Sequence, residues 1–299
     1  MFDARCSRLD SPPRPPFFPE PSSFEFRASN FASTGPLGRS PPAVLYQKRE
    51  RIAHITLNRP EALNAFSREQ HEQLNAAWHD FREDDNVWVA IVTGAGERAF
   101  SAGADVKEMG QRREGERRRS FWETWSGNNL QGGLEVWKPT IAAINGYCLG
   151  EGLTLALSCD FRIASERATF GFPEVNIGLA TIVGAARAPR VVGLGNALEL
   201  LLIGDRVDAQ RAYDMGLVMR LVPHEQLASE AEALAQRLCR NGPLAVRATK
   251  EVAVRSQQLP FDDAVRMGES LRRLVNQSED AREGPAAFRE KRAPEFKGR

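Results

Sequence analysis

The stretch from Thr140 to Asp160 reads TIAAINGYCLGEGLTLALSCD. It begins as a short apolar run, breaks at Gly150 and Gly152, and resumes as an apolar run of helical length, which predicts a strand, a glycine turn and a buried helix. The first N–H groups of such a helix lack intrahelical partners and lie at the positive end of the helix dipole. We therefore expect the turn to hold negative charge, on a phosphate, a ligand carboxylate or a reacting carbonyl.

The composition is that of a globular protein. The chain has 299 residues, of which 42% are hydrophobic and 26% charged, and a formal net charge of +1. That is enough for one large or two modest domains with a core. The near-neutral charge argues against nucleic-acid binding, and no apolar run approaches the ~20 residues that span a bilayer, so we expect no membrane segment.

The cysteines and histidines form no metal-binding pattern. The four cysteines, Cys6, Cys148, Cys159 and Cys239, contain no CxxC pair, and the four histidines are scattered. Structural metal sites bring such ligands together at short, regular spacings. We therefore expect no metal site and a reduced, cytoplasmic protein.

Residues 1–42 differ from the rest of the chain. Nine of its 18 prolines fall there, among Ser, Arg and Phe without periodicity. Because proline removes backbone donors and blocks helix and sheet, this segment is predicted to be a disordered extension.

Residues 43–225 are predicted to form a strand-rich core. Val44–Asn58 has the pattern of a hairpin, and Ser67 with Gln70 has that of a capping box before a helix. One face of that helix carries Leu74, Trp78 and Phe81, and residues 84–86 end it. Further strands are expected at 87–92, 161–164, 168–172 and 217–222.

Residues 226–299 are predicted to be helical. Leu227, Ala231, Leu234 and Leu238 fall on one stripe, and Gly242 ends that helix. Three more helices are expected at about 243–257, 261–276 and 279–291. Their apolar stripes predict that this region packs on the core or on another subunit.

Three further patterns have ordinary explanations. Residues 94–99 match GxGxxA, but strand and loop residues follow where a dinucleotide site needs a helix. Between residues 105 and 129, arginines 112, 113, 117, 118 and 119 indicate a solvated face, or phosphate binding by one or two of them. Phe121, Trp122 and Trp125 indicate core packing or an apolar ligand pocket.

Five segments together resemble the enoyl-CoA hydratase/isomerase (crotonase) family. They occur in the family's order and extend the resemblance over about residues 44–299. The segments are Leu57–Ala65 (LNRPEALNA), Phe100–Asp105 (FSAGAD), Asn145–Asp160, Phe170–Glu174 (FGFPE) and Phe288–Lys297 (FREKRAPEFK).

The resemblance implies an α/β fold, a spiral of ββα units with a C-terminal helical trimerisation region, assembled as a trimer or a dimer of trimers. It implies an acyl-CoA thioester substrate and no cofactor besides the CoA of that substrate. Two backbone N–H groups, those of Ala102 and Glu151, would clamp the thioester oxygen as an oxyanion hole. The substrate would also border Ala62, Gly103, Ala104 and Asp105, with Phe288 and Lys291 near the adenine and phosphates of CoA.

The catalytic carboxylates are where this sequence departs from the family pattern. Hydratases of the family use two glutamates; the second matches Glu174, whereas the first falls at Thr154, which can hydrogen-bond water but is not a base. Glu151 replaces a customary glycine, and we expect its side chain to point to solvent, with a role as substitute acid or base as the alternative. The segment 178–187 also departs from the usual glycine-rich loop.

These residues favour hydration or dehydration of an enoyl-CoA, with Glu174 as the single acid/base. The alternatives are a double-bond isomerase, which needs only one base, and a non-catalytic CoA-binding scaffold, which the missing glutamate would suit. The acyl group is not specified by the sequence.

Overall fold

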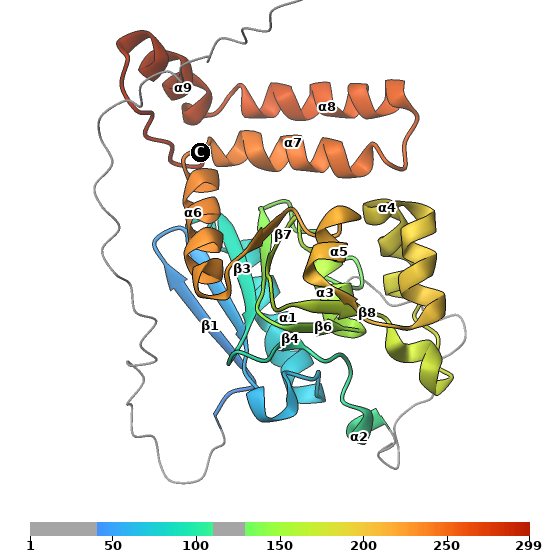
Figure 1. Cartoon of the computed structure of the whole chain (residues 1–299). Coiled ribbons are helices and arrows are strands. Elements are labelled where there is room, and N and C mark those ends of the chain that lie inside the picture. The colour runs from blue at the N-terminus through green and yellow to red at the C-terminus, as the bar shows by residue number, and fades with distance from the viewer. Residues whose placement is uncertain (1–40, 110–128) are drawn as a thin grey trace, which may run out of the picture. The chain divides into compact units, whose positions relative to one another are not determined.

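The computed structural model describes residues 41–109 and 129–299 (Figure 1). Residues from Pro42 to Arg299 form one compact unit. The predicted proline-rich extension, apart from its last two residues, lies outside the described residues, as do the five arginines and the three aromatic residues between 105 and 129.

Two sheets organise this unit. The six-stranded sheet has the order β1-β2-β3-β5-β7-β10, and the four-stranded sheet has the order β4-β6-β8-β9. The strands of the first are β1 (Val44–Arg49), β2 (Ile52–Leu57), β3 (Val89–Gly94), β5 (Thr140–Ile144), β7 (Phe161–Ser165) and β10 (Arg220–Val222). Those of the second are β4 (Ala99–Ser101), β6 (Tyr147–Leu149), β8 (Thr169–Gly171) and β9 (Val207–Asp208).

The strands alternate between the two sheets along the chain. β3, β5 and β7 run parallel in the larger sheet, and each is followed by a short strand, β4, β6 or β8, in the smaller one. A helix follows each pair: α2 (Val106–Met109), α3 (Glu151–Ser158), and η2 (Pro173–Ile177) with α4 (Val183–Leu198). This is the predicted spiral of ββα units.

The opening stretch contains one strand more than predicted. Its first apolar run bends at Asn145–Gly146, so that β5 and β6 belong to different sheets. A Cβ on Gly146 would lie 2.2 Å from the Arg98 carbonyl oxygen, so only glycine fits this bend. The dinucleotide-like residues 94–99 lead into β4 and not into a helix, as expected.

The central strands are buried on both faces, which explains their continuous apolar runs. Ala90, Val92 and Ala142 pack in one hydrophobic cluster with α3 and with α1 (Arg68–Glu83). Alternate residues such as Ile91 and Ile141 pack in a second cluster with α6 (Leu227–Cys239).

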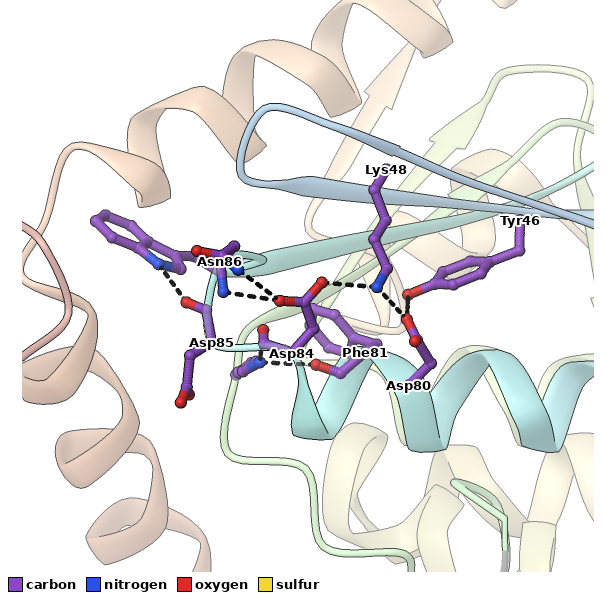
Figure 2. A network of polar contacts seen from close by, with 9 residues as sticks. Tyr46, Lys48, Asp80, Phe81, Asp84, Asp85 and Asn86 are labelled. Atoms are coloured by element: carbon purple, nitrogen blue, oxygen red, sulfur yellow. Dashed lines mark hydrogen bonds and ion pairs between the residues drawn. The ribbon is translucent and has the colours of Figure 1, made fainter.

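Helix α1 begins and ends where predicted. Ser67 Oγ accepts a hydrogen bond from the Gln70 N–H, and Leu74, Trp78 and Phe81 are fully buried. The capping box is only half formed, because the Gln70 side chain donates to the Ala43 carbonyl instead of returning to the cap. Figure 2 shows the polar network at the C-terminal end, where Lys48 lies between Asp80 and Asp84 and the Tyr46 hydroxyl donates to Asp80.

The segment that follows Glu174 was not predicted as a helix. Residues 183–198 form α4, which Gly193 interrupts with a φ of 75°. The segments η3 (Glu199–Ile203), α5 (Ala209–Asp214) and η4 (His224–Gln226) complete the core. Glycine, proline and alanine dominate α4, so its sequence lacks the apolar stripe that marks other helices.

The C-terminal helices match their predicted ranges. They are α6, α7 (Pro243–Arg255), α8 (Phe261–Val275) and α9 (Glu279–Glu290). α6 packs on β3, β5 and β7, and α7 pairs with α8 (Figure 1). Lys250 of α7 pairs with Asp160 at 2.6 Å, which ties this region to the start of β7. Among the described residues, no helix is long and apolar enough to cross a membrane.

Candidate active site

The glycine turn presents one N–H at the start of α3 that has no acceptor in the described part of the chain. Gly150 has φ 53° and ψ −121°, and its own N–H donates to the Gly171 carbonyl at 2.9 Å. The Gly150 carbonyl points along the helix and accepts from the Thr154 N–H. Since C=O and N–H point in opposite directions across a trans peptide, the Glu151 N–H points out of the helix. No acceptor for it occurs among the described residues.

The segment after β4 contains a second N–H without an acceptor among residues 41–109 and 129–299. Phe66 donates to the Gly103 carbonyl at 2.8 Å and accepts from the Asp105 N–H at 3.0 Å. The carbonyl of the Gly103–Ala104 peptide points toward Phe66, so the Ala104 N–H on the same peptide points away from it. No described residue accepts a hydrogen bond from this N–H. The Ala102 N–H, in contrast, donates to the Leu63 carbonyl at 2.9 Å.

Gly103 brings these two segments together. A Cβ on this residue would lie 3.1 Å from the Leu149 carbonyl oxygen and 3.4 Å from the Glu151 nitrogen. Gly103 also has a φ of 96°, which favours glycine. The backbone at residue 103 therefore lies directly against the start of α3.

The Glu174 carboxylate lies against the same turn. A Cβ on Gly150 would be 3.1 Å from Glu174 Oε1. Glu174 Oε2 is buried and has no hydrogen-bond partner within the described part of the chain. A buried carboxylate oxygen without a partner is costly, so it marks a position for a ligand, a water molecule or a transferred proton.

Thr154 lies one turn into α3 and is buried. Its hydroxyl donates to the Gly150 carbonyl at 3.3 Å, so its lone pairs are left to accept a hydrogen bond. It supplies no basic group beside Glu174.

The Glu151 side chain does not extend into solvent, contrary to expectation. It is 25% exposed, and its Oε1 lies 3.4 Å from His71 Nε2 of α1. Burial opposes the charged form of His71, but hydrogen bonding to Glu151 and the charges of Glu151 and Glu108 outweigh burial and raise the pKa of His71. Nothing in the local sequence around either residue indicated this pairing.

Arg59 and Asn64 support the segment 102–105. Arg59 donates to Asp105 Oδ2 at 3.0 Å and to the Ala65 carbonyl at 2.6 Å. The buried Asn64 amide donates to the carbonyls of Ala95 and Ala99. Ala62 lies in the adjoining turn η1 (Pro60–Ala62). The sequence identified this turn by family resemblance, but it gave no role to Arg59 or Asn64.

Two predicted residues are not part of this cluster within one chain. Phe288 lies on α9 and is 85% exposed, and Lys291 caps the same helix in a left-handed conformation. Figure 1 shows α9 apart from α3. The structure thus brings together residues 102–105, 150–154 and 174, and it places Phe288 and Lys291 elsewhere.

These groups define the kind of chemistry that the site can perform. Two neighbouring N–H groups without an acceptor among the described residues can polarise an acyl carbonyl, and a nearby carboxylate can move a proton at the adjacent carbon. Among residues 41–109 and 129–299, no group of three or more His, Cys, Asp or Glu side chains could hold a metal ion. Fold and site together define an acyl-activating enzyme of the ββα-spiral class.

Comparison with known proteins gives the family. Residues 47–299 match the sequence family described as enoyl-CoA hydratase/isomerase. (E)-benzylidenesuccinyl-CoA hydratase of Thauera aromatica is 37% identical over 85% of this chain and 99% of its own length. Crotonyl-CoA hydratase of Syntrophomonas wolfei is also 37% identical, over 85% and 97%. The chain belongs to the enoyl-CoA hydratase/isomerase family.

Solved structures confirm the predicted fold class. An enoyl-CoA hydratase/isomerase from Mycobacterium paratuberculosis matches with a TM-score of 0.79 and 39% identity, covering 86% of this chain and 99% of that one.

Proposed function

We propose that this protein adds water to the double bond of an enoyl-CoA thioester and catalyses the reverse dehydration. One observation carries this proposal: the buried Oε2 of Glu174 has no hydrogen-bond partner among the described residues, and this carboxylate lies against the turn that presents the Glu151 N–H. The hydratases among the relatives support water addition over isomerisation.

The two N–H groups form the oxyanion hole in this proposal. We assign them to Glu151 and Ala104, because the Ala102 N–H already bonds to Leu63 and Ala104 is the next residue whose N–H has no partner among the described residues. As water adds to the β-carbon, negative charge moves to the thioester oxygen, where these dipoles stabilise the enolate.

Glu174 then transfers the proton. Its carboxylate takes a proton from the attacking water and returns it to the α-carbon of the enolate, so that H and OH add across the double bond. The lone pairs of Thr154 accept a hydrogen bond from this water and orient it. No cofactor besides the CoA of the substrate takes part.

The first test replaces the carboxylate. Glu174→Gln preserves size and hydrogen bonding but removes the base, so kcat for crotonyl-CoA hydration should fall by about 10²–10⁴. The matched control is Glu225→Gln, on η4, with an unchanged rate. Wild-type kcat in Glu174→Gln would refute the assignment, and conversion of a 3-enoyl-CoA without hydration would favour the isomerase.

The second test removes one N–H without disturbing the helix. Glu151 is the first residue of α3, where proline is well tolerated because its missing N–H has no helical partner. Glu151→Pro should therefore lower kcat by roughly 10²–10³. Glu151→Ala keeps the N–H and serves as the control for loss of the side chain; equal losses in both variants would contradict an oxyanion role for this N–H.

The assembly and compartment are also proposals. We propose a homotrimer or dimer of trimers, in which the exposed Phe288 and Lys291 reach the CoA bound by a neighbouring subunit. The free thiols of Cys148, Cys159 and Cys239 suit a reducing compartment, and we propose the cytoplasm.

A further inference from the structure

His71 pairs with Glu151, the residue whose backbone N–H is one of the two proposed oxyanion donors. Glu151 carries that N–H on its backbone, and its carboxylate lies 3.4 Å from His71 Nε2. The two side chains are 30% and 25% exposed, so solvent only partly screens the contact. Since the pair ties the first residue of α3 to α1, it restrains the peptide that presents the N–H.

Phe66 connects the same histidine to the other donor. The Phe66 and His71 rings stack with centroids 5.2 Å apart and planes inclined by 25°. The Phe66 backbone holds Gly103 and Asp105, the residues on either side of Ala104. The short segment 66–71 therefore contacts the Glu151 side chain, next to one donor, and the residues on either side of Ala104, next to the other.

The charges around His71 favour its protonated form. Of the described residues, Glu151 on α3 and Glu108 on α2 act on the ring, and both raise the pKa of His71. Glu108 also accepts from the Arg68 N–H at 3.0 Å, which keeps it beside α1. Because the pKa of His71 is raised, His71 stays protonated and paired with Glu151 closer to neutral pH than an ordinary histidine would.

We propose that His71 is a positioning residue that acts through Glu151 to hold the two oxyanion donors in register on the thioester oxygen. The proposal rests on the proposed function and deepens it, because it explains why a glutamate occupies the donor position. His71 and the Glu151 carboxylate do not contact the reacting atoms in this account. Turnover should fall when His71 loses its proton.

The experiment measures carbonyl polarisation separately from turnover. Butyryl-CoA labelled with ¹³C at the thioester carbonyl has no double bond to hydrate, so its bound resonance reports the oxyanion hole alone. We expect a downfield shift in the wild type that shrinks as pH rises through the His71 titration. His71→Gln, which keeps an amide donor without charge, and Glu151→Gln should give smaller shifts that no longer change with pH. His79→Gln, on the same helix, is the control and should match the wild type.

Kinetics on crotonyl-CoA give the second readout. A loosened donor is worth less than a lost one, so kcat in His71→Gln should fall about 10-fold with KM nearly unchanged. Wild-type shift and pH profile in His71→Gln would overturn the proposal. Loss of turnover in Glu151→Gln with an unchanged shift would also overturn it, since Glu151 would then act on the reacting atoms.

The two measurements distinguish a wrong reaction from a wrong role for His71. If the wild type hydrates no enoyl-CoA but its butyryl-CoA shift depends on His71, the proposed reaction is wrong and the positioning role stands. If the wild type hydrates crotonyl-CoA but bound butyryl-CoA shows no downfield shift, the reaction stands, and the oxyanion hole and the positioning role are wrong.

Discussion

At the scale of single residues, glycines set the geometry of the site. Gly150 adopts a backbone conformation that other residues rarely adopt, and Gly103 lets two distant segments touch. Between them they place the Glu151 N–H, the Ala104 peptide and Glu174 in one small region. The proposed chemistry depends on the backbone N–H groups of Glu151 and Ala104, and the identity of a side chain does not show where its backbone N–H points.

Gly150→Ala tests this dependence. Alanine would be strained at φ 53°, and its Cβ would lie 3.1 Å from Glu174 Oε1. The free energy of unfolding should therefore fall by about 1–3 kcal/mol. Because the carboxylate must also shift, kcat should fall by about 10²-fold. Urea unfolding and crotonyl-CoA hydration measure the two effects.

Gly195→Ala is the matched control for that variant. Gly195 lies in α4 with no heavy atom within 4 Å of an added Cβ. Its substitution should leave kcat unchanged and stabilise the helix by up to ~1 kcal/mol. Equal behaviour of the two alanine variants would contradict the special role of Gly150.

At the scale of elements, the end of α1 relies on a buried lysine. Lys138 is 3% exposed and donates to the carbonyls of Phe81 and Asp84 at 2.7 and 2.6 Å. The Phe81 carbonyl has no other donor among the described residues, whereas the Asp84 carbonyl also accepts from the Val87 N–H at 3.1 Å. Nearby, Lys48 pairs with Asp80 and Asp84 in the network of Figure 2.

Lys138→Met should show how this lysine affects stability. Burial lowers the pKa of Lys138 to about 8, below its value in the unfolded chain. Between that pH and about 10.5, the unfolded state binds more protons, so the lysine's contribution to stability rises with pH. The variant should be less stable by about 1–3 kcal/mol at neutral pH, because the Phe81 carbonyl loses its donor and the Asp84 carbonyl keeps only the Val87 N–H. Its deficit should widen as pH rises from 8 to 10.

Urea unfolding of the wild type and of Lys138→Met at pH 7.5, 9 and 10 measures the difference in their free energies of unfolding. Groups that titrate alike in the two proteins cancel in this difference. Lys297→Met removes an amine that is 58% exposed and serves as the control. A deficit that stays constant with pH would show that Lys138 titrates alike in the folded and unfolded states.

Periodicity predicted most elements for a simple reason. The stripes of α1 and α6 and the apolar runs of β3, β5 and β7 face a core, so burial imposes their pattern. Helix α4 and strand β6 were missed because close packing and sharp bends at Gly146 and Gly193 govern them. The half-formed capping box was missed because Gln70 finds a tertiary acceptor at Ala43.

At the scale of the whole molecule, exposed apolar side chains support the proposed assembly. On α8, Phe261 is 80% and Leu274 66% exposed, with Val265 between them also exposed. Phe261 and Val265 are four residues apart and therefore share one face of α8, and a large exposed apolar patch is unusual on a monomer. A second copy of this chain is the occupant we propose, since the family resemblance places the trimerisation region at these helices.

Phe261→Asp should therefore weaken the assembly. A carboxylate cannot be buried unpaired in an apolar interface, so the oligomer should dissociate at concentrations where the wild type stays assembled. Light scattering after size-exclusion chromatography measures the mass, and circular dichroism checks the fold. Phe261→Tyr keeps the ring and should remain assembled; unchanged assembly in Phe261→Asp would place the interface elsewhere.

The sequence by itself determined the class of fold, the family and Glu174 as the residue to test. It could do so because local periodicity reports burial and because short motifs carry the family's chemistry at fixed spacing. Only the tertiary structure decided that the Ala102 N–H is already bonded to Leu63 and that Glu151 pairs with His71. Both depend on contacts between segments far apart in the chain, whose relative placement no local spacing encodes.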